Sequence, residues 1–198
     1  MDDKLISDAI AYMQDLFRGN ADGHDAAHTL RVWRTALLLA RSEPGCDVQL
    51  VALAALLHDV DDHKLFRTED QANARAFLES RGVPPERIAR ICEAIASVSF
   101  SRNRGRRPAT LEGQIVQDAD RLDAIGAIGI ARTFAYGGRH GRDLESSIAH
   151  FHEKLLLLRD EMNTPAARAL AEERHAFMTQ FLAQYEKESA ADRPPLCR

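Results

Sequence analysis

Four residues from three separate segments of the chain have side chains that could hold one divalent metal ion together: His28, His58, Asp59 and Asp120. Imidazole nitrogens and carboxylate oxygens suit Mn, Mg, Fe, Ni, Co or Zn, and this ligand chemistry alone does not choose among them. Because no cysteine belongs to the set, a purely structural zinc site is disfavoured. Four protein ligands would leave positions on an octahedral ion for water and a substrate phosphate. We therefore expect one divalent metal ion as the cofactor.

The pair His58-Asp59 ends a segment that should be buried on most sides. In residues 47–59, apolar side chains cover nearly the whole circumference of a helix. A carboxylate carried into the interior there costs several kcal/mol unless it is paired or coordinates a metal. Adjacent helical residues point about 100° apart, so both side chains reach one ion only if it lies just beyond the helix end. Taken alone, the pair fits a structural role better.

His28 lies on the apolar stripe of another helix. It shares with Val32, Ala36 and Leu39 a face that should turn toward the core, and His24 lies one turn earlier on that face. The alternative interpretation of His28 is a buried histidine whose ring is hydrogen-bonded to the protein.

Asp120 and Asp123 stand three residues apart in the otherwise apolar stretch 115–130, whose small residues would let another helix approach closely. The alternative is a solvated acidic cluster. We expect Asp120 to be the metal ligand and Asp123 to be a partner of His28 or of an arginine. Carboxylates in such positions fix the tautomer of a metal-binding histidine.

Helices should carry these residues, because Ala- and Leu-rich segments with three- and four-residue apolar spacing recur along the chain and strand signals are almost absent. We expect helices over 4–18, 24–42, 47–59, 68–81, 85–98, 110–122, 124–136, 142–160 and 165–188. Thr164-Pro165 predicts the N-cap and first residue of the last helix. The sequence thus predicts an all-α, single-domain bundle of irregular packing over 1–190, with the metal motifs in 24–125, C-terminal helices in 142–188 and a flexible tail at 191–198.

The composition disfavours several classes of partner. The 198 residues carry a net charge of −4 and a pI near 6.1, which does not favour polymeric nucleic acid or an anionic membrane. No apolar run reaches the roughly 18 residues of a membrane helix, and the acidic start does not resemble a signal peptide. Cys46, Cys92 and Cys197 fit neither a disulfide framework nor a metal clip. We expect a cytoplasmic protein, with the oligomeric state open and a homodimer as one option.

The segment Ser101–Pro108 holds four arginines around a glycine. One interpretation is a solvated, flexible loop. The other is a mobile arm that attracts phosphate through side chains such as Arg104 and Arg106, since a guanidinium matches phosphate oxygens bidentately. The segment is too short, and too poor in aromatic residues, for a nucleic-acid platform.

The ordered pattern of His28, His58-Asp59 and Asp120 resembles that of the HD-domain metal-dependent phosphohydrolases. The contexts 23–32, 57–64 and 118–126, together with 131–138 and 152–158, are similar to a small stand-alone bacterial subgroup, and the resemblance spans residues 20–185. His-Asp alone is weak evidence, whereas three motifs in this order and context are strong evidence. The resemblance implies an all-helical fold around the metal and hydrolysis of a phosphate ester or anhydride, often in a nucleotide.

Some motifs of related enzymes differ or are missing. The run Asp120-Arg121-Leu122 resembles that of the alarmone (guanosine tetraphosphate) hydrolases, and Asp62 stands where those enzymes carry a glutamate. His63 replaces the aspartate that follows there, which argues against alarmone chemistry. The sequence also lacks the GYP extension of cyclic-dinucleotide phosphodiesterases and the extra histidines for a second metal. The resemblance therefore implies a single-metal site.

The residues that follow the ligand pair suggest a mechanism. Asp62 lies one helical turn past His58-Asp59 and could orient or deprotonate the attacking water, and Lys64 could neutralise a phosphate oxygen. For each, a salt bridge in solvent is the alternative. His24 and Arg31 are candidates for substrate contacts, with a salt bridge or solvent as the alternative for Arg31.

The resemblance favours a metal-dependent phosphohydrolase acting on a nucleotide. The favoured substrate is a (deoxy)nucleoside triphosphate or a related phosphoanhydride, cleaved to release pyrophosphate or phosphate. A nucleoside monophosphate phosphatase or a phosphodiesterase is the second interpretation. A third belongs to another class: a sensor that binds metal and nucleotide without catalysis. In each case the partner is a small phosphate compound.

Overall fold

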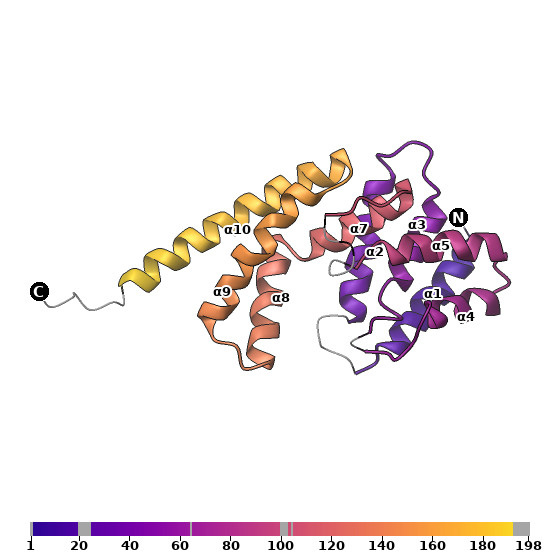
Figure 1. Ribbon diagram of the computed structural model, residues 1–198, viewed down its shortest axis with the longest axis horizontal. Coiled ribbons are helices and arrows are strands. Elements are labelled where there is room, and N and C mark those ends of the chain that lie inside the picture. Colours follow the sequence, from indigo (N-terminus) through magenta and orange to yellow (C-terminus); the bar gives the residue numbers. More distant parts are fainter. Residues whose placement is uncertain (1, 20–24, 64, 100–102, 104, 192–198) are drawn as a thin grey trace, which may run out of the picture.

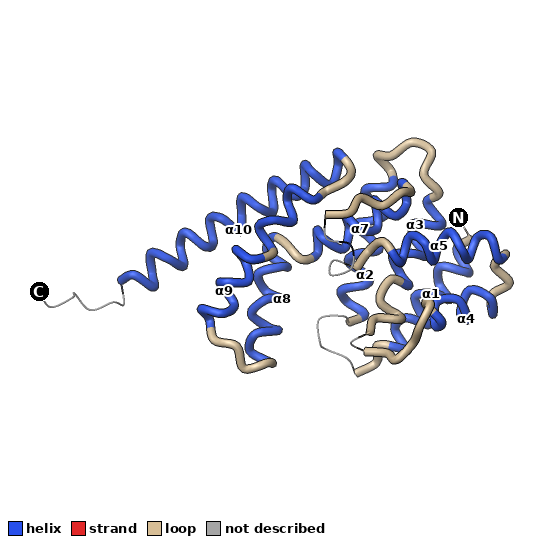
Figure 2. Tube along the Cα trace, viewed as in Figure 1, coloured by secondary structure: helices blue, strands red, loops and turns tan. Residues whose placement is uncertain are grey.

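The computed structural model describes residues 2–19, 25–63, 65–99, 103 and 105–191. Over these residues the fold is all-α, as the sequence predicts, without any strand (Figure 2). The helices are α1 (Asp3–Leu16), α2 (Ala26–Ala40), α3 (Val48–Leu57), α4 (Ala72–Ser80), α5 (Pro85–Ala96), α7 (Leu111–Asp123), α8 (Gly126–Arg139), α9 (Leu144–Glu153), the 3-10 helix η1 (Leu155–Glu161) and α10 (Pro165–Ala191). None of the helices in the described ranges is long and apolar enough to cross a bilayer.

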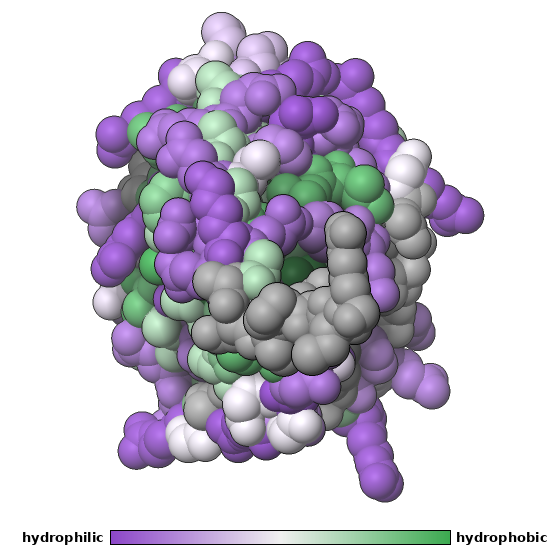
Figure 3. Space-filling model, turned by 90° about the vertical axis from the view of Figure 1, so that its left-hand side faces the viewer, coloured by the Kyte–Doolittle hydropathy of each residue, from purple (hydrophilic) through white to green (hydrophobic). Residues whose placement is uncertain are grey.

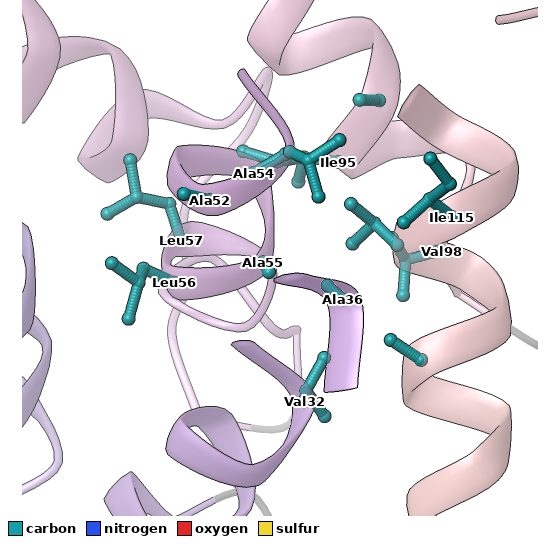
Figure 4. Packing of buried hydrophobic residues seen from close by; sticks show 14 of the residues in the cluster. Val32, Ala36, Ala52, Ala54, Ala55, Leu56, Leu57, Ile95, Val98 and Ile115 are labelled. Atoms are coloured by element: carbon teal, nitrogen blue, oxygen red, sulfur yellow. The ribbon is translucent and has the colours of Figure 1, made fainter. Parts of the chain in front are cut away.

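The helix α3 is the centre of the larger group of helices, and α1, α2, α5 and α7 pack around it (Figure 1). Every residue from Leu50 to Leu57 is at most 1% exposed, so the helix is buried on most sides, as the sequence predicts. Figure 4 shows its alanines and leucines among side chains of the neighbouring helices, including Val32, Ala36 and Ile95. The apolar helix ends at Leu57, and the first polar group that it delivers to the core is His58, its C-cap.

A second group of helices, α8, α9, η1 and α10, lies beside the first (Figure 1). Its packing uses the rings of Phe134, Phe151 and Phe181, whose centroids are 5.9–6.0 Å apart. The C-terminal part of α10 extends past the other helices (Figure 1). The end of the molecule that these helices form is largely hydrophilic, with narrower hydrophobic strips between the polar side chains (Figure 3).

The predicted helix over 142–160 is wrong as a single element. α9 ends at Glu153, Lys154 leaves the helical conformation at φ −139° and ψ −58°, and η1 follows. A 3-10 helix has about three residues per turn, so Leu155 and Leu158 lie on one face. Both are buried, at 3% and 1% exposed, and this shared burial explains the departure from α-helical spacing.

The predicted helix over 68–81 begins later than expected. Asp70 and Gln71 have positive φ angles of 50° and 58°, and α4 starts at Ala72. The carboxylate of Asp61 accepts hydrogen bonds from the backbone nitrogens of Asn73 (2.9 Å) and Ala74 (3.0 Å). A side chain from the preceding segment therefore caps the helix, in place of a residue at its own N-cap position.

The predicted start of the last helix is confirmed. α10 begins at Pro165, and Thr164 Oγ1 accepts a hydrogen bond from the backbone nitrogen of Ala167 (3.4 Å). The helix continues to Ala191, beyond the predicted end at 188 and into the first residue of the predicted tail. The rest of that tail, 192–198, lies outside the described residues.

A buried polar cluster joins α7 to the start of α10. Asp118, fully buried, accepts hydrogen bonds of 2.8 Å from both backbone nitrogens and both side chains of Asn163 and Thr164. Asn163 Nδ2 also donates to Gln117 Oε1 (2.9 Å). Burial keeps the pKa of Asp118 above its ordinary value despite these four donors. The carboxylate thus fixes the position of α10 relative to the helix that carries Asp120.

A buried arginine adds a further link from α7 to η1. Arg121 is 3% exposed and donates from Nη1 to the backbone oxygen of Glu161. Its Nη2 lies 3.1 Å from Glu161 Oε2. Because a guanidinium is costly to bury without a counter-charge, this pair holds the end of η1 against α7.

The corner between α7 and α8 is closed by two glycines. Gly126 has a φ of +74°, and a Cβ there would lie 2.9 Å from Arg174 Cγ of α10. A Cβ at Gly129 would lie 2.2 Å from the backbone oxygen of Ala124. The small residues predicted to permit close approach therefore let α8 begin directly against the end of α7.

We predict that Asp118→Ala lowers the free energy of unfolding by about 3 kcal/mol, because four buried donors lose their shared acceptor. Denaturant unfolding followed by circular dichroism measures the loss. The matched control is Asp160→Ala, whose exposed carboxylate pairs with Arg159 at the surface, and it should cost less than about 0.5 kcal/mol. Equal losses in the two variants would contradict the role given to Asp118.

Candidate metal centre

Three elements bring the predicted ligands together. His28 lies in the first turn of α2, where the carboxylate of Asp25 caps the helix by accepting from the His28 backbone nitrogen (2.7 Å). His58 and Asp59 follow the end of α3, and Asp120 lies in the last turn of α7. His28, His58 and Asp120 each offer one potential ligand atom, and these three atoms lie within 4.8 Å of one another.

Asp59 lies at the same point. Its Oδ2 is 3.5 Å from Nε2 of His28 and 3.2 Å from Nε2 of His58. Asp120 Oδ1 is 3.3 Å and 3.9 Å from the same two nitrogens. Both imidazole side chains are only 2% exposed, whereas that of Asp120 is 26% exposed. The centre is therefore enclosed on the histidine side and open toward solvent beside Asp120.

Hydrogen bonds at the other ring nitrogen orient both histidines. His58 Nδ1 lies 2.8 Å from the backbone oxygen of Ala55, and His28 Nδ1 lies 2.7 Å from Asp123 Oδ2. A carbonyl or ionised carboxylate can only accept, so in each ring Nδ1 carries a proton. The neutral form of each ring then presents the lone pair of Nε2 to the two carboxylates, as metal ligation requires.

The electrostatics of the group fit a divalent cation. Burial alone would lower the pKa of His58, but the carboxylates of Asp59 and Asp120 outweigh it and raise the pKa to about 9. The pKa of His28 is also raised, by its hydrogen bonds to Asp120 and Asp123 against burial. The two histidines hold the pKa of Asp120 below its ordinary value, again against burial. Carboxylates that favour positive charge on both imidazoles would equally favour a divalent ion bound to the same donor atoms.

Asp123 lies beside His28 and not among the ligand atoms. Besides His28, it accepts from Arg31 (Nε 2.7 Å, Nη2 3.0 Å) and from Arg132 Nη1 (2.6 Å). Burial opposes its ionisation, but His28 and the arginines hold the pKa of this carboxyl well below its usual range. Asp123 is therefore ionised, and it joins α2, α7 and α8 at one point. Nothing in the sequence pattern pointed to Arg132 as its third partner.

The other predicted site residues are placed as follows. Asp62 is half-buried just past the ligand pair, and its backbone nitrogen donates to Asp59 O (3.0 Å). Arg31 donates hydrogen bonds to both carboxylate oxygens of Asp123. Arg106 is exposed ahead of α7 and, within the described part of the chain, forms no hydrogen bond or ion pair with the centre. His24, Lys64 and Arg104 lie outside the described residues.

Comparison with known proteins identifies the family. The family model of the HD domain matches residues 25–125, a range that includes all four predicted ligands. The chain belongs to the HD-domain family. This confirms the family that the sequence motifs resemble.

Relatives match the chain over most of its length. YpgQ of Bacillus subtilis is 44% identical over 186 residues, covering 89% of this chain and 90% of that protein. The crystal structure of YpgQ in complex with ADP superposes with a TM-score of 0.80 at 40% identity, covering 92% of this chain and 97% of that one. An HD-superfamily hydrolase from Bacillus thuringiensis gives a TM-score of 0.79 at 41% identity, covering 97% and 100%. The match to a protein described as an HD-superfamily hydrolase supports a hydrolase activity for this chain.

We predict that Asp120→Asn lowers the affinity for Mn²⁺ by at least about 100-fold, because the amide removes the charge of the ligand on the open side. Calorimetric titration and elemental analysis of the purified protein measure the change. His152→Ala, an exposed histidine of α9, serves as the control and should bind Mn²⁺ like the wild type. Full metal content in Asp120→Asn would show that the ion binds elsewhere.

A pH dependence follows from the raised pKa of His58. The folded pKa of about 9 exceeds the ordinary 6.5, so in the metal-free protein the proton stabilises the folded state below pH 6.5, and this stabilisation is lost as the pH rises through 9. We predict that unfolding free energy, measured in denaturant with a chelator present, falls over this window. His58→Gln should flatten the slope and His152→Ala should retain it; the same slope in His58→Gln would assign the effect to other groups.

Proposed function

We propose that this protein is a metal-dependent phosphohydrolase that cleaves a phosphoanhydride bond of a nucleotide, with a (deoxy)nucleoside triphosphate as the favoured substrate. The observation that carries the proposal is the convergence of His28, His58 and Asp120, whose ligand atoms lie within 4.8 Å, with Asp59 beside them. Relatives described as HD-superfamily hydrolases support hydrolysis. The ADP complex of YpgQ supports a nucleotide as the ligand.

The centre would hold one divalent ion through the two Nε2 atoms and the carboxylates of Asp59 and Asp120. Such an ion, when bound, supplies positive charge to phosphate oxygens and makes a neighbouring water more acidic. The protein keeps both imidazoles in the tautomer that suits this ion through Asp123 and the backbone oxygen of Ala55. The exposed side of Asp120 is where the substrate phosphates would enter.

Asp62 is the residue proposed to handle the proton. The water oxygen bonds to phosphorus, the bond from phosphorus to the leaving phosphate or pyrophosphate breaks, and the water proton passes to the Asp62 carboxylate. General-base assistance of this kind contributes a factor of about 10² to 10⁴ in rate. The position of Asp62 directly after the ligand pair supports the role, since its backbone already bonds to Asp59.

Positive side chains would complete the site around the phosphates. Lys64, His24 and the arginines Arg104 and Arg106 remain proposed phosphate or substrate contacts. Arg31 could reach a phosphate only by giving up hydrogen bonds to Asp123, so its main proposed role is to hold that carboxylate.

The test is product identification with a panel of nucleoside mono-, di- and triphosphates and their deoxy forms, in the presence of Mn²⁺, resolved by ion-exchange chromatography. We expect loss of the triphosphates with release of pyrophosphate or phosphate. Binding of nucleotide without turnover under any metal would favour a sensor and contradict the proposal. Release of phosphate from monophosphates alone would make the protein a phosphatase of another substrate class.

The proposed proton transfer to Asp62 can be tested with matched variants of two neighbouring residues. Asp62→Asn should lower kcat about 100-fold or more with metal content unchanged. Asp61→Asn should retain kcat below its unfolding temperature, because the Asp61 carboxylate caps α4 through Asn73 and Ala74. Similar kcat values in the two variants would remove Asp62 from the mechanism.

A further inference from the structure

One face of α8 turns toward the metal centre. Arg132 marks it, because its Nη1 reaches Asp123 Oδ2 (2.6 Å), and the same oxygen accepts from Arg31 of α2 (3.0 Å). Residues four positions apart on a helix share a face, so Ile128 and Tyr136 lie on either side of Arg132. In Figure 1, α8 is on the side of the second group of helices that faces α2.

This face is apolar and exposed, although α8 is well packed on its opposite side. Ile128 is 45% and Tyr136 40% exposed, and Ala135 between them is exposed as well. On the other side of the helix, Phe134 packs against Phe151 and Phe181. α8 is therefore well packed through Phe134, and Ile128 and Tyr136 form a separate, exposed apolar surface on its other side.

The Tyr136 ring is held in a fixed orientation. It stacks on His140 with centroids 3.9 Å apart, and the Arg142 guanidinium lies 5.1 Å from its centroid. A ring immobilised in this way loses little conformational entropy when a ligand packs against its exposed part. The same contacts place the Arg142 guanidinium at the far end of the face, which suits an anionic ligand.

We propose that this face of α8 binds the nucleoside part of the substrate, with Ile128 and Tyr136 as specificity residues. The inference rests on the proposed function, which puts the phosphates of a nucleotide at the metal centre. A nucleotide anchored there must extend its sugar and base outward, past the open side of Asp120. The α8 face contacts α7 at Asp123, one helical turn from Asp120. It combines apolar side chains with arginines, the combination that suits a flat apolar base attached to an anion.

The position of the face is fixed by Asp123, which lies beside the candidate metal centre. Asp123 joins the helix carrying His28 to the helix carrying Ile128 and Tyr136 through hydrogen bonds of 2.6–3.0 Å. Gly129 lets the start of α8 pack directly against the end of α7, since a Cβ there would lie 2.2 Å from the backbone oxygen of Ala124. A nucleotide that contacts both the metal centre and the α8 face would therefore meet its phosphate-binding and nucleoside-binding groups at a constant spacing.

The experiment compares two ligands on the full-length protein with Mn²⁺ by calorimetric titration: ADP, which carries a nucleoside, and inorganic pyrophosphate, which does not. Ile128→Ala and Tyr136→Ala should each raise the Kd for ADP about tenfold, the effect of removing apolar contacts from a pocket, and leave the Kd for pyrophosphate unchanged. Leu144→Ala and Phe177→Ala, at 59% and 49% exposed on α9 and α10, are the controls and should leave both constants unchanged.

The outcomes separate the two proposals. Wild-type protein that binds neither ligand would overturn the proposed function and this inference together. ADP binding that survives in both α8 variants, or weakens equally with pyrophosphate binding, would overturn only the inference. Sedimentation of the same variants tests self-association: a wild-type dimer that Ile128→Ala or Tyr136→Ala dissociates, with an unchanged Kd for ADP, would assign the face to a second copy of the chain instead.

Discussion

Charge buried at the end of an apolar helix must be balanced nearby, and the organisation of this protein depends on that constraint. α3 is apolar on every side, so its position in the core brings His58 and Asp59 inside with it. Neither residue can be left uncompensated there. The first turn of α2 and the last turn of α7 supply His28 and Asp120, and the four groups balance one another within hydrogen-bonding or ion-pair distance. A divalent ion bound at this point would be balanced by the same carboxylates.

Three aspartates of α7 lie in three different environments and have different structural roles. Asp118 faces α10 and is saturated by backbone and side-chain donors. Asp120 faces the metal centre and keeps partial access to solvent. Asp123, at the end of the helix, accepts from groups on α2 and α8. Their environments, and not their chemistry, set these roles, since the same carboxyl group has a raised pKa at 118 and lowered pKa values at 120 and 123.

The sequence predicts the convergence of His28, His58 and Asp120, because each of them lies in an apolar context that favours a buried position. The all-α class and the N-terminal end of α10 follow from equally local signals. What the sequence does not reveal arises from contacts between distant segments. Arg132 of α8 reaches Asp123 of α7 across the corner where Gly129 packs against Ala124, and Asp61 caps α4 from outside the helix. The break at Lys154 depends on burying Leu155 and Leu158 together, which no single-helix pattern reports.

The link between α7 and the C-terminal helices bears on where this protein can be divided. The HD family model ends at residue 125, and a fragment cut there would contain all four candidate metal ligands. It would also lack Asn163, Thr164 and Glu161, leaving the Asp118 carboxylate and the Arg121 guanidinium on an exposed side of α7 without the groups they bind. The segment that carries the candidate ligands is thus shorter than the segment whose buried charges are all paired, and the C-terminal helices belong to the longer one.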